Sequence, residues 1–397
     1  GRGAVTPPDA LGPRMTPCGP TLASPGLETL RSQLAEAMPA TLLDVSWPAL
    51  EPVFAASPYL ASLARRRPEA LERMLAARPE DTLADILMQT RALDGGTEAM
   101  KRPLRQLKAD LHLLTALADL GWVWDLEAVT AALSRFADAT AEAALRAVAH
   151  DLRERGKLVA AADPDNPLPG LFGLAMGKHG ALELNYSSDI DISLFYDPAT
   201  LAGALAEGVE MQRTVDRAAQ AFAALLTERT GDGYVFRVDL RLRPDPSSTP
   251  PVVAVPMALD YYEGVGQNWE RAAFIKARVV LGDRAAGRDF LQALVPFVWR
   301  RSLDYQAILD VQSIKRQIHV HKTGEGLEAA GANLKLGRGG IREIEFYAQT
   351  QQLILGGRDP ALRLPATRAA LAALTRAGHV PEATRAALDE AYVRLRG

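Results

Sequence analysis

Two aspartates that stand two residues apart are the residues of this sequence best suited to chemistry. Asp189 and Asp191 lie in the segment MGKHGALELNYSSDIDISLFYD and alternate with Ile190 and Ile192. In a β-strand, this alternation directs both carboxylates to one face and the aliphatic side chains to the other. Neighbouring carboxylates repel each other, and a hard cation such as Mg²⁺ removes that repulsion while keeping coordination sites for phosphate oxygens.

A glycine-containing turn precedes this acidic strand. Gly177 ends the short apolar run LFGLAMG, which predicts a buried strand, and Gly180 follows three residues later. Backbone amides at a glycine can approach a phosphate group closely because no Cβ stands in the way. The turn and the two aspartates together predict a metal site that handles phosphate, and the preference between Mg²⁺ and Mn²⁺ stays open.

A third aspartate lies in a second alternating segment, YVFRVDLRLRP, at residues 234–244. The pattern predicts a half-buried strand that ends at Pro244 and carries Asp239, Arg241 and Arg243 on its polar face. If the two strands are neighbours in one sheet, three carboxylates can hold a pair of metal ions about 3.5–4 Å apart. The arginines then offer forked donors to phosphate oxygens. A solvated strand face with Arg–Asp pairs is the alternative.

The composition excludes several other classes of function. Of 397 residues, 48% are hydrophobic and 23% are charged, which is typical of a globular protein with two or three domains. The net charge of −3 argues against a broad nucleic-acid surface. Cys18 is the only cysteine, which fits a reducing compartment. No segment has the roughly 18 consecutive apolar residues of a membrane span. We therefore expect a cytoplasmic protein without nucleic-acid or membrane partners.

The elements that must position these residues predict an α+β fold. Apolar residues recur at helical spacing before and after the acidic strands, Asp125 is the expected N-cap of one helix, and a further helix is expected over residues 202–229. A dinucleotide-binding fold is disfavoured because no GxGxxG motif stands at a strand–helix junction. The predicted ranges are a flexible tail (1–25), an N-terminal helical domain (26–160), a catalytic domain (161–284) and a C-terminal helical domain (285–397).

Two further basic segments allow a structural and a functional interpretation. Lys335 and Arg338 stand with two glycines before an amphipathic helix, where an anion site and a helix-capping loop are equally favoured. In NWERAAFIKARVV, Arg271 and Arg278 are seven residues apart, and solvated side chains are the expected outcome. Glu270, in the same segment, is expected to be structural rather than catalytic.

The ordered motifs resemble those of a known enzyme family. GKHGALELNYSSDID, FRVDLRLRPD, WERAAFIKARVVLGD, RRSLD and LKLGRGGIREIEF occur in the order seen in the bifunctional glutamine synthetase adenylyltransferase/adenylyl-removing enzymes. Those enzymes have two homologous nucleotidyltransferase halves of the DNA polymerase beta-like superfamily. The motifs are most similar to the N-terminal, adenylyl-removing half and cover roughly residues 50–397.

The resemblance implies a specific activity. The N-terminal half removes AMP from the adenylylated tyrosine of glutamine synthetase, using inorganic phosphate and releasing ADP, and a PII signal protein regulates it, with the uridylylated form expected here. Transferred to this sequence, Asp189, Asp191 and Asp239 are the metal-binding and catalytic acids. Gly177, Lys178 and Ser188 belong to the nucleotide-phosphate turn. The motifs match one half of a two-part enzyme, so a fragment or an isolated domain is expected.

Two alternatives stay open at this point. One is a nucleotidyltransferase of the same superfamily that acts on another acceptor, which three acids alone do not exclude. The other is a regulatory module that responds to PII protein and holds glutamine synthetase without performing chemistry. Metal-dependent release of ADP separates catalysis from simple binding.

Overall fold

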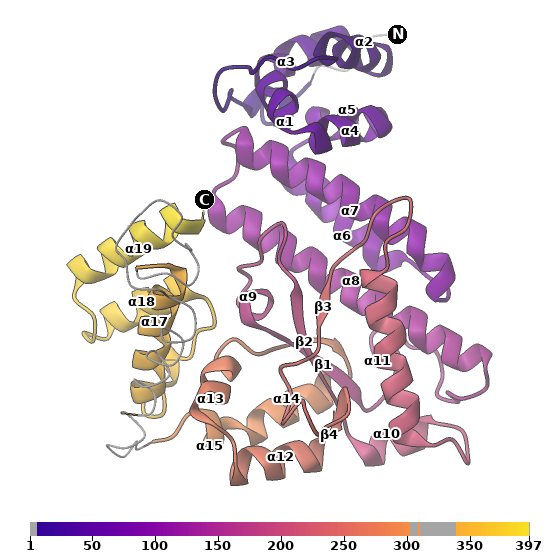
Figure 1. Cartoon of the computed structure of the whole chain (residues 1–397), viewed down its shortest axis with the longest axis vertical. Coiled ribbons are helices and arrows are strands. Elements are labelled where there is room, and N and C mark those ends of the chain that lie inside the picture. Colours follow the sequence, from indigo (N-terminus) through magenta and orange to yellow (C-terminus); the bar gives the residue numbers. More distant parts are fainter. Residues whose placement is uncertain (1–5, 302–308, 310–338, 397) are drawn as a thin grey trace. The chain divides into compact units, whose positions relative to one another are not determined.

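The computed structural model describes residues 6–301, 309 and 339–396. In these residues, helices combine with a five-stranded mixed sheet, so the α+β class predicted from the sequence is confirmed (Figure 1). The chain divides into two compact units. Unit 1 consists of Gly1–Ala147, Leu184–Ser188 and Ala224–Arg237, and unit 2 consists of Val148–Glu183, Asp189–Ala223 and Val238–Gly397.

Unit 1 is built from helices. Three of them begin with a proline, a residue whose fixed φ and missing N–H suit the first helical position. Asp125 accepts a hydrogen bond from the amide of Ala128 at 2.8 Å, which confirms the predicted N-cap. The helices are α1 (Leu11–Arg14), α2 (Leu27–Ala37), α3 (Ala40–Ala56), α4 (Pro58–Arg66), α5 (Pro68–Ala76), α6 (Pro79–Ala92), α7 (Thr97–Leu120) and α8 (Leu126–Glu154), whose last residues belong to unit 2.

Part of the segment predicted as a flexible tail is packed against the helices. Ala10 and Leu11 are fully buried, and the amide of Leu11 donates to the carbonyl oxygen of Ala77 at 2.8 Å. Proline and glycine lower helix propensity, but the burial of these apolar side chains outweighs that local preference.

Unit 1 also holds the two segments that lead into the acidic strands. Arg105 of α7 donates to the carbonyl oxygen of Gly233 at 2.9 Å, and Lys108 donates to another backbone carbonyl of the same segment. The amide of Leu184 donates to the hydroxyl of Ser134 in α8 at 3.1 Å. The backbone that precedes each acidic strand is therefore anchored to a long helix.

Unit 2 contains the sheet. Its strand order is β3-β2-β1-β5, and β4 also pairs with β2. β1 pairs antiparallel with β2 and β5, whereas β2 pairs parallel with β3 and β4. The strands are β1 (Leu171–Met176), β2 (Ile190–Tyr196), β3 (Val238–Asp239), β4 (Val252–Ala254) and β5 (Arg278–Gly282).

Aromatic side chains form the centre of the core beneath this sheet. Phe172 and Phe195, from β1 and β2, stack with ring centroids 5.8 Å apart, and the ring centroid of Phe290 lies 4.6 Å from that of Phe195.

The predicted helix over residues 202–229 is shorter than expected and corresponds to α11. Further helices of this part are α9 (Gly177–Gly180), α10 (Pro198–Ala204), α11 (Met211–Thr227), α12 (Val255–Gly264), α13 (Asn268–Phe274), α14 (Arg284–Ala293) and α15 (Val295–Val298).

The second acidic strand is much shorter than the sequence pattern predicts. Of residues 234–244, only Val238 and Asp239 pair in the sheet. The amide of Phe236 donates instead to Leu226 at the end of α11 (3.0 Å), and that of Arg241 donates to the Asp239 carboxylate (2.9 Å). The alternation predicted a longer strand, but local partners took the backbone groups that such a strand needs.

The C-terminal helices of unit 2 pack on a core of their own. Ile344, Leu371 and Tyr392 are buried there, one from each helix. The elements are α17 (Ile341–Leu355), the 3-10 turn η1 (Pro360–Leu362), α18 (Thr367–Arg376) and α19 (Glu382–Arg396). Nowhere in the described ranges does a helix combine the length and apolar character needed to cross a bilayer.

Candidate functional site

Two of the three predicted acids are direct neighbours across a strand pair. Asp191 of β2 and Asp239 of β3 are register partners in the parallel ladder. Paired residues of neighbouring strands project to the same face of a sheet. Asp189 directly precedes β2 and is exposed. The two acid-bearing strands are therefore neighbours in one sheet, which is the condition on which the three-acid site depended.

Arg241 supplies a positive charge among these acids. Its guanidinium donates to both carboxylate oxygens of Asp239, at 2.6 Å from Nη2 and 3.0 Å from Nε. This bonding holds the pKa of Asp239 below its usual value. The pKa of Arg241 is raised, chiefly by its hydrogen bond to Asp239, and the charges of Asp191 and Asp189 add to that effect. The guanidinium thus lies in the field of all three carboxylates, while 82% of its side chain is exposed.

The glycine turn is fitted against the acidic strand. Gly177 has a φ of +55°, and a Cβ built on it lies 2.6 Å from the Oδ2 atom of Asp191. Gly180 is close-packed for a different reason, because a Cβ built on it would collide with the carbonyl oxygen of Lys276. Gly177 therefore lets the turn approach the carboxylate of Asp191, whereas the space at Gly180 is taken by the backbone of the protein itself.

The remaining predicted phosphate contacts occupy different environments. Ser188 closes a local turn, in which its hydroxyl accepts from the amide of Asn185 at 3.3 Å. Arg243 donates to the carbonyl oxygens of Leu240 (2.7 Å) and Thr249 (3.2 Å), so it holds the loop after β3. Of the two arginines predicted to contact phosphate, Arg241 is the one that lies beside the acids, and a phosphate role for Arg243 stays a prediction.

The donor chemistry suits a divalent cation, although the side chains are not gathered around one point. Among the residues that the structure describes, no three His, Cys, Asp or Glu side chains form a group able to hold a metal ion. Asp239 is held by Arg241, and hard carboxylate oxygens at registered positions are the ligands that Mg²⁺ prefers. Binding of a divalent cation by these acids stays a prediction, and it requires Asp239 to exchange its guanidinium partner for the cation.

The segment from Asn268 to Val280 differs from the prediction of solvated arginines. Arg271 is fully buried, and its Nε donates to the carbonyl oxygen of Phe297 at 3.0 Å. Arg278 donates to the carbonyl oxygen of Gly180 at 3.2 Å. The expectation of a solvated side chain was therefore wrong for Arg271. The two arginines also lie on different elements, because α13 ends at Phe274 and β5 begins at Arg278.

Two other sequence predictions have different outcomes. Glu270 is structural, as expected: it forms a reciprocal capping box with Gln267 at the start of α13. Lys335 and Arg338, the candidates for a second anion site, lie outside the described residues. The helix predicted after them is present as α17.

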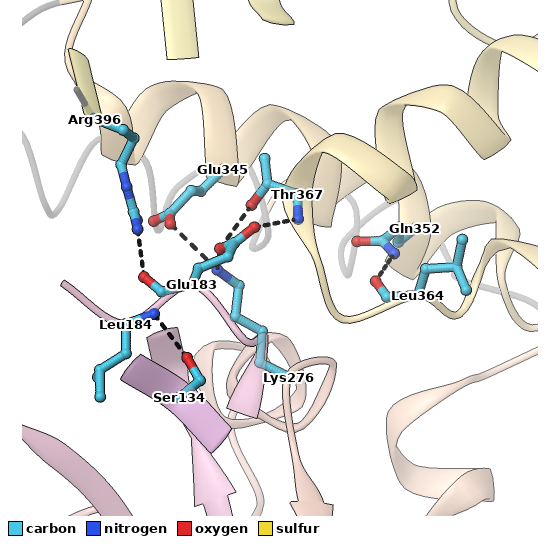
Figure 2. A network of polar contacts seen from close by, with 9 residues as sticks. All are labelled: Ser134, Glu183, Leu184, Lys276, Glu345, Gln352, Leu364, Thr367 and Arg396. Carbon is cyan, nitrogen blue, oxygen red and sulfur yellow. Dashed lines mark hydrogen bonds and ion pairs between the residues drawn. The ribbon is translucent and has the colours of Figure 1, made fainter. Parts of the chain in front are cut away.

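A buried charged network behind the glycine turn was not predicted from the sequence. Figure 2 shows Lys276 between the carboxylates of Glu183 and Glu345, with Nζ–oxygen distances of 3.5 and 3.3 Å. Glu183 also accepts from the backbone amide of Thr367 at 2.7 Å. The sequence could have indicated this network only through the place of Glu183, in the ELN motif directly after the turn. The residues that contact Glu183 are remote in the sequence, so no local pattern connects them with it.

Comparisons with known proteins point to one family. A family profile described as glutamate-ammonia ligase adenylyltransferase matches residues 47–293. A second, described as GlnD PII-uridylyltransferase, matches residues 312–397.

Curated relatives agree with the first profile. A bifunctional glutamine synthetase adenylyltransferase/adenylyl-removing enzyme from Caulobacter vibrioides is 57% identical over 393 residues, covering 97% of this chain and 40% of the relative. Proteins of the same name from a Bradyrhizobium species and from Xanthobacter autotrophicus are 47% and 50% identical, over 95% and 86% of this chain. The chain spans 37% and 34% of those two relatives, well under half of their length.

Proposed function

Because the chain belongs to the glutamate-ammonia ligase adenylyltransferase family, we propose that it removes AMP from the adenylylated tyrosine of glutamine synthetase by metal-dependent phosphorolysis. The observation that carries this proposal is the registered pair Asp191 and Asp239, of which Asp191 lies against the turn at Gly177. We assign the module at residues 161–284 to the DNA polymerase beta-like nucleotidyltransferases and the chain to the adenylyl-removing half of the family. The mixed sheet supports the first assignment, and the second rests on the resemblance of the sequence motifs.

The reaction is an in-line displacement at the phosphorus atom of AMP. An oxygen of inorganic phosphate forms the new P–O bond, the bond from phosphorus to the tyrosine oxygen breaks, and the tyrosine oxygen takes up a proton. The products are ADP and unmodified glutamine synthetase. Phosphate is already an anion, so the nucleophile needs no general base.

The proposed roles of the individual site residues follow from the chemistry of their side chains. Asp189, Asp191 and Asp239 hold Mg²⁺ or Mn²⁺, which when bound neutralises the charge that develops on the transferred phosphoryl group. Arg241 exchanges the carboxylate of Asp239 for a phosphate oxygen, a step that its exposure permits. The turn at Gly177 and Lys178 binds the nucleotide phosphate. Ser188, which directly precedes Asp189 in the sequence, is assigned to the same phosphate contact.

The partners follow from the same assignment. We propose glutamine synthetase as the protein substrate and a PII signal protein, in its uridylylated form, as the regulator. The match of residues 312–397 to a PII-uridylyltransferase profile supports a connection with PII signalling. We place the reaction in the cytoplasm, where glutamine synthetase and PII proteins meet.

The test is ADP formation from adenylylated glutamine synthetase, inorganic phosphate and Mg²⁺. We expect ADP to require phosphate and to fall by at least about a thousandfold in Asp191→Asn, because a carboxylate oxygen that faces the developing charge is lost. Asp165→Asn, which changes an exposed aspartate of the preceding linker, is the matched control. Absence of ADP from the wild-type protein, with uridylylated PII protein present, refutes the proposal and favours a module that binds without catalysis.

A further inference from the structure

The carboxylate of Glu183 is buried directly behind the glycine turn. Only 8% of the residue is exposed, and its Oε1 atom accepts the backbone amide of Thr367, the first residue of α18, at 2.7 Å. Its Oε2 atom lies 3.5 Å from the Nζ atom of Lys276. One side chain therefore joins the end of the turn to a C-terminal helix and to the segment before β5.

Lys276 extends this connection to α17. Its ammonium group is 3.3 Å from the Oε1 atom of Glu345 and 7% of its side chain is exposed. The pKa of Glu345 is lowered in spite of burial, because Lys276 and, at longer range, Arg342 and Lys178 are positively charged. Lys178 of the phosphate turn is therefore in the electrostatic field of the Glu345 carboxylate, which α17 carries.

The backbone of the turn is tied to the same cluster. The amide of Glu183 donates to the carbonyl oxygen of Lys178 at 2.8 Å, so displacement of Glu183 also displaces the lysine. Gly180 packs against the backbone of Lys276, and Arg396 of α19 donates to the carbonyl oxygen of Glu183. The turn is thus held by residues from three C-terminal helices.

The buried charges of Glu183, Lys276 and Glu345 are better suited to fixing the position of the turn than to increasing the stability of the fold. Buried ion pairs lose solvation on folding and are often replaceable by apolar groups at little cost in stability, but their directed bonds favour one arrangement. We propose that Glu183 is a positioning residue, which with Lys276 fixes the Gly177–Lys178 turn to helices α17–α19. The placement of these helices then sets the affinity of the turn for inorganic phosphate. The choice of inorganic phosphate as ligand rests on the proposed function, in which the turn binds the nucleotide phosphate and the attacking inorganic phosphate must lie directly beside it.

The experiment compares Glu183→Gln with Glu382→Gln, which removes an exposed ion pair with Arg385 on α19. We expect Glu183→Gln to raise KM for phosphate by about 10- to 100-fold with kcat changed less, since mispositioning weakens the first contact with the nucleophile. Hydrogen–deuterium exchange of residues 177–183 should become faster in Glu183→Gln alone. Unchanged exchange and unchanged KM in a folded Glu183→Gln protein overturn the inference, as does an equal effect of Glu382→Gln.

A triple variant covers the case in which Glu183→Gln does not fold. Glu183→Gln/Lys276→Met/Glu345→Gln removes all three charges, so that none of them is left buried without its partner. We expect it to fold, to exchange rapidly at residues 177–183 and to bind inorganic phosphate weakly by calorimetry. Wild-type exchange and wild-type phosphate binding in this variant overturn the inference. Exchange and calorimetry need no turnover, so they test positioning even where the wild-type protein forms no ADP.

Discussion

A Cβ placed on Gly177 lies 2.6 Å from the Oδ2 atom of Asp191, so the glycine turn and the acidic strand are fitted to each other at atomic contact. The strand ladder explains the contact, because Met176, the last residue of β1, is the register partner of Asp191. The turn therefore begins where the carboxylate projects. We therefore expect a phosphate group bound at this turn to lie close to a metal ion bound by Asp191.

Gly177→Ala is expected to disturb this arrangement. The new methyl group must displace the carboxylate, and the φ of +55° is unfavourable for alanine by about 1–2 kcal/mol. We expect the affinity for Mn²⁺, used as a calorimetric probe, to fall about tenfold or more. Gly203→Ala is the control, because a Cβ at Gly203 meets nothing within 4 Å. Wild-type Mn²⁺ affinity in Gly177→Ala contradicts the proposed place of the metal.

Arg241→Met tests the guanidinium that holds Asp239. The pKa of Asp239 is lowered, first by its hydrogen bond with Arg241, so this pair contributes stability above the usual aspartate pKa of 3.8, and the contribution is lost as the pH falls below it. We expect wild type to melt at a higher temperature than Arg241→Met at pH 7, with the difference disappearing in acid. A difference in Tm that persists unchanged at pH 2 argues against this ion pair as its origin.

Lys108→Met tests a lysine that is buried in unit 1. Burial lowers the pKa of Lys108 to about 7, and the ammonium lies 4.1 Å from the ring centroid of Phe236. Between pH 7 and the ordinary lysine pKa of 10.5, the unfolded chain binds a proton that the folded chain does not. Stability therefore rises with pH over this range, by at most about 1.4 kcal/mol per pH unit.

The measurement is urea unfolding of wild type and Lys108→Met from pH 7 to pH 10. We expect the wild-type free energy of unfolding to increase with pH relative to that of the variant. Equal slopes for the two proteins show that Lys108 stays charged in the folded state. Lys157→Met, which removes a partly exposed lysine, is the control for the general effect of losing a lysine.

Arg271→Ala tests a buried arginine with a structural role. Its guanidinium donates to the carbonyl oxygens of Phe297 and Val298 and to the side chain of Asn268. Truncation leaves these acceptors without donors and removes packed methylene groups, so we expect a loss of about 2–4 kcal/mol in the free energy of unfolding. Chemical denaturation measures it, and Arg217→Ala, an exposed site on α11, should change stability little. Equal stability of wild type and Arg271→Ala contradicts the structural role.

The local pattern of the sequence determined the elements that carry the acids. The alternation around Asp189 and Asp191 predicted the strand β2, whereas the phosphate chemistry inferred from the acids and glycines stays a prediction. These features depend on spacing within a few residues, which the sequence displays directly. Asp125 as an N-cap was predictable for the same reason.

Only the tertiary structure decided which charged residues are buried and which partners they have. Arg271 and Lys276 lie in a segment whose spacing suggested a solvated face, yet their partners come from residues 297–298, 183 and 345. The length of β3 was decided in the same way, by the capture of backbone groups around Asp239. A pattern of polar and apolar residues specifies faces, whereas the burial of a charge depends on which remote groups fold against it.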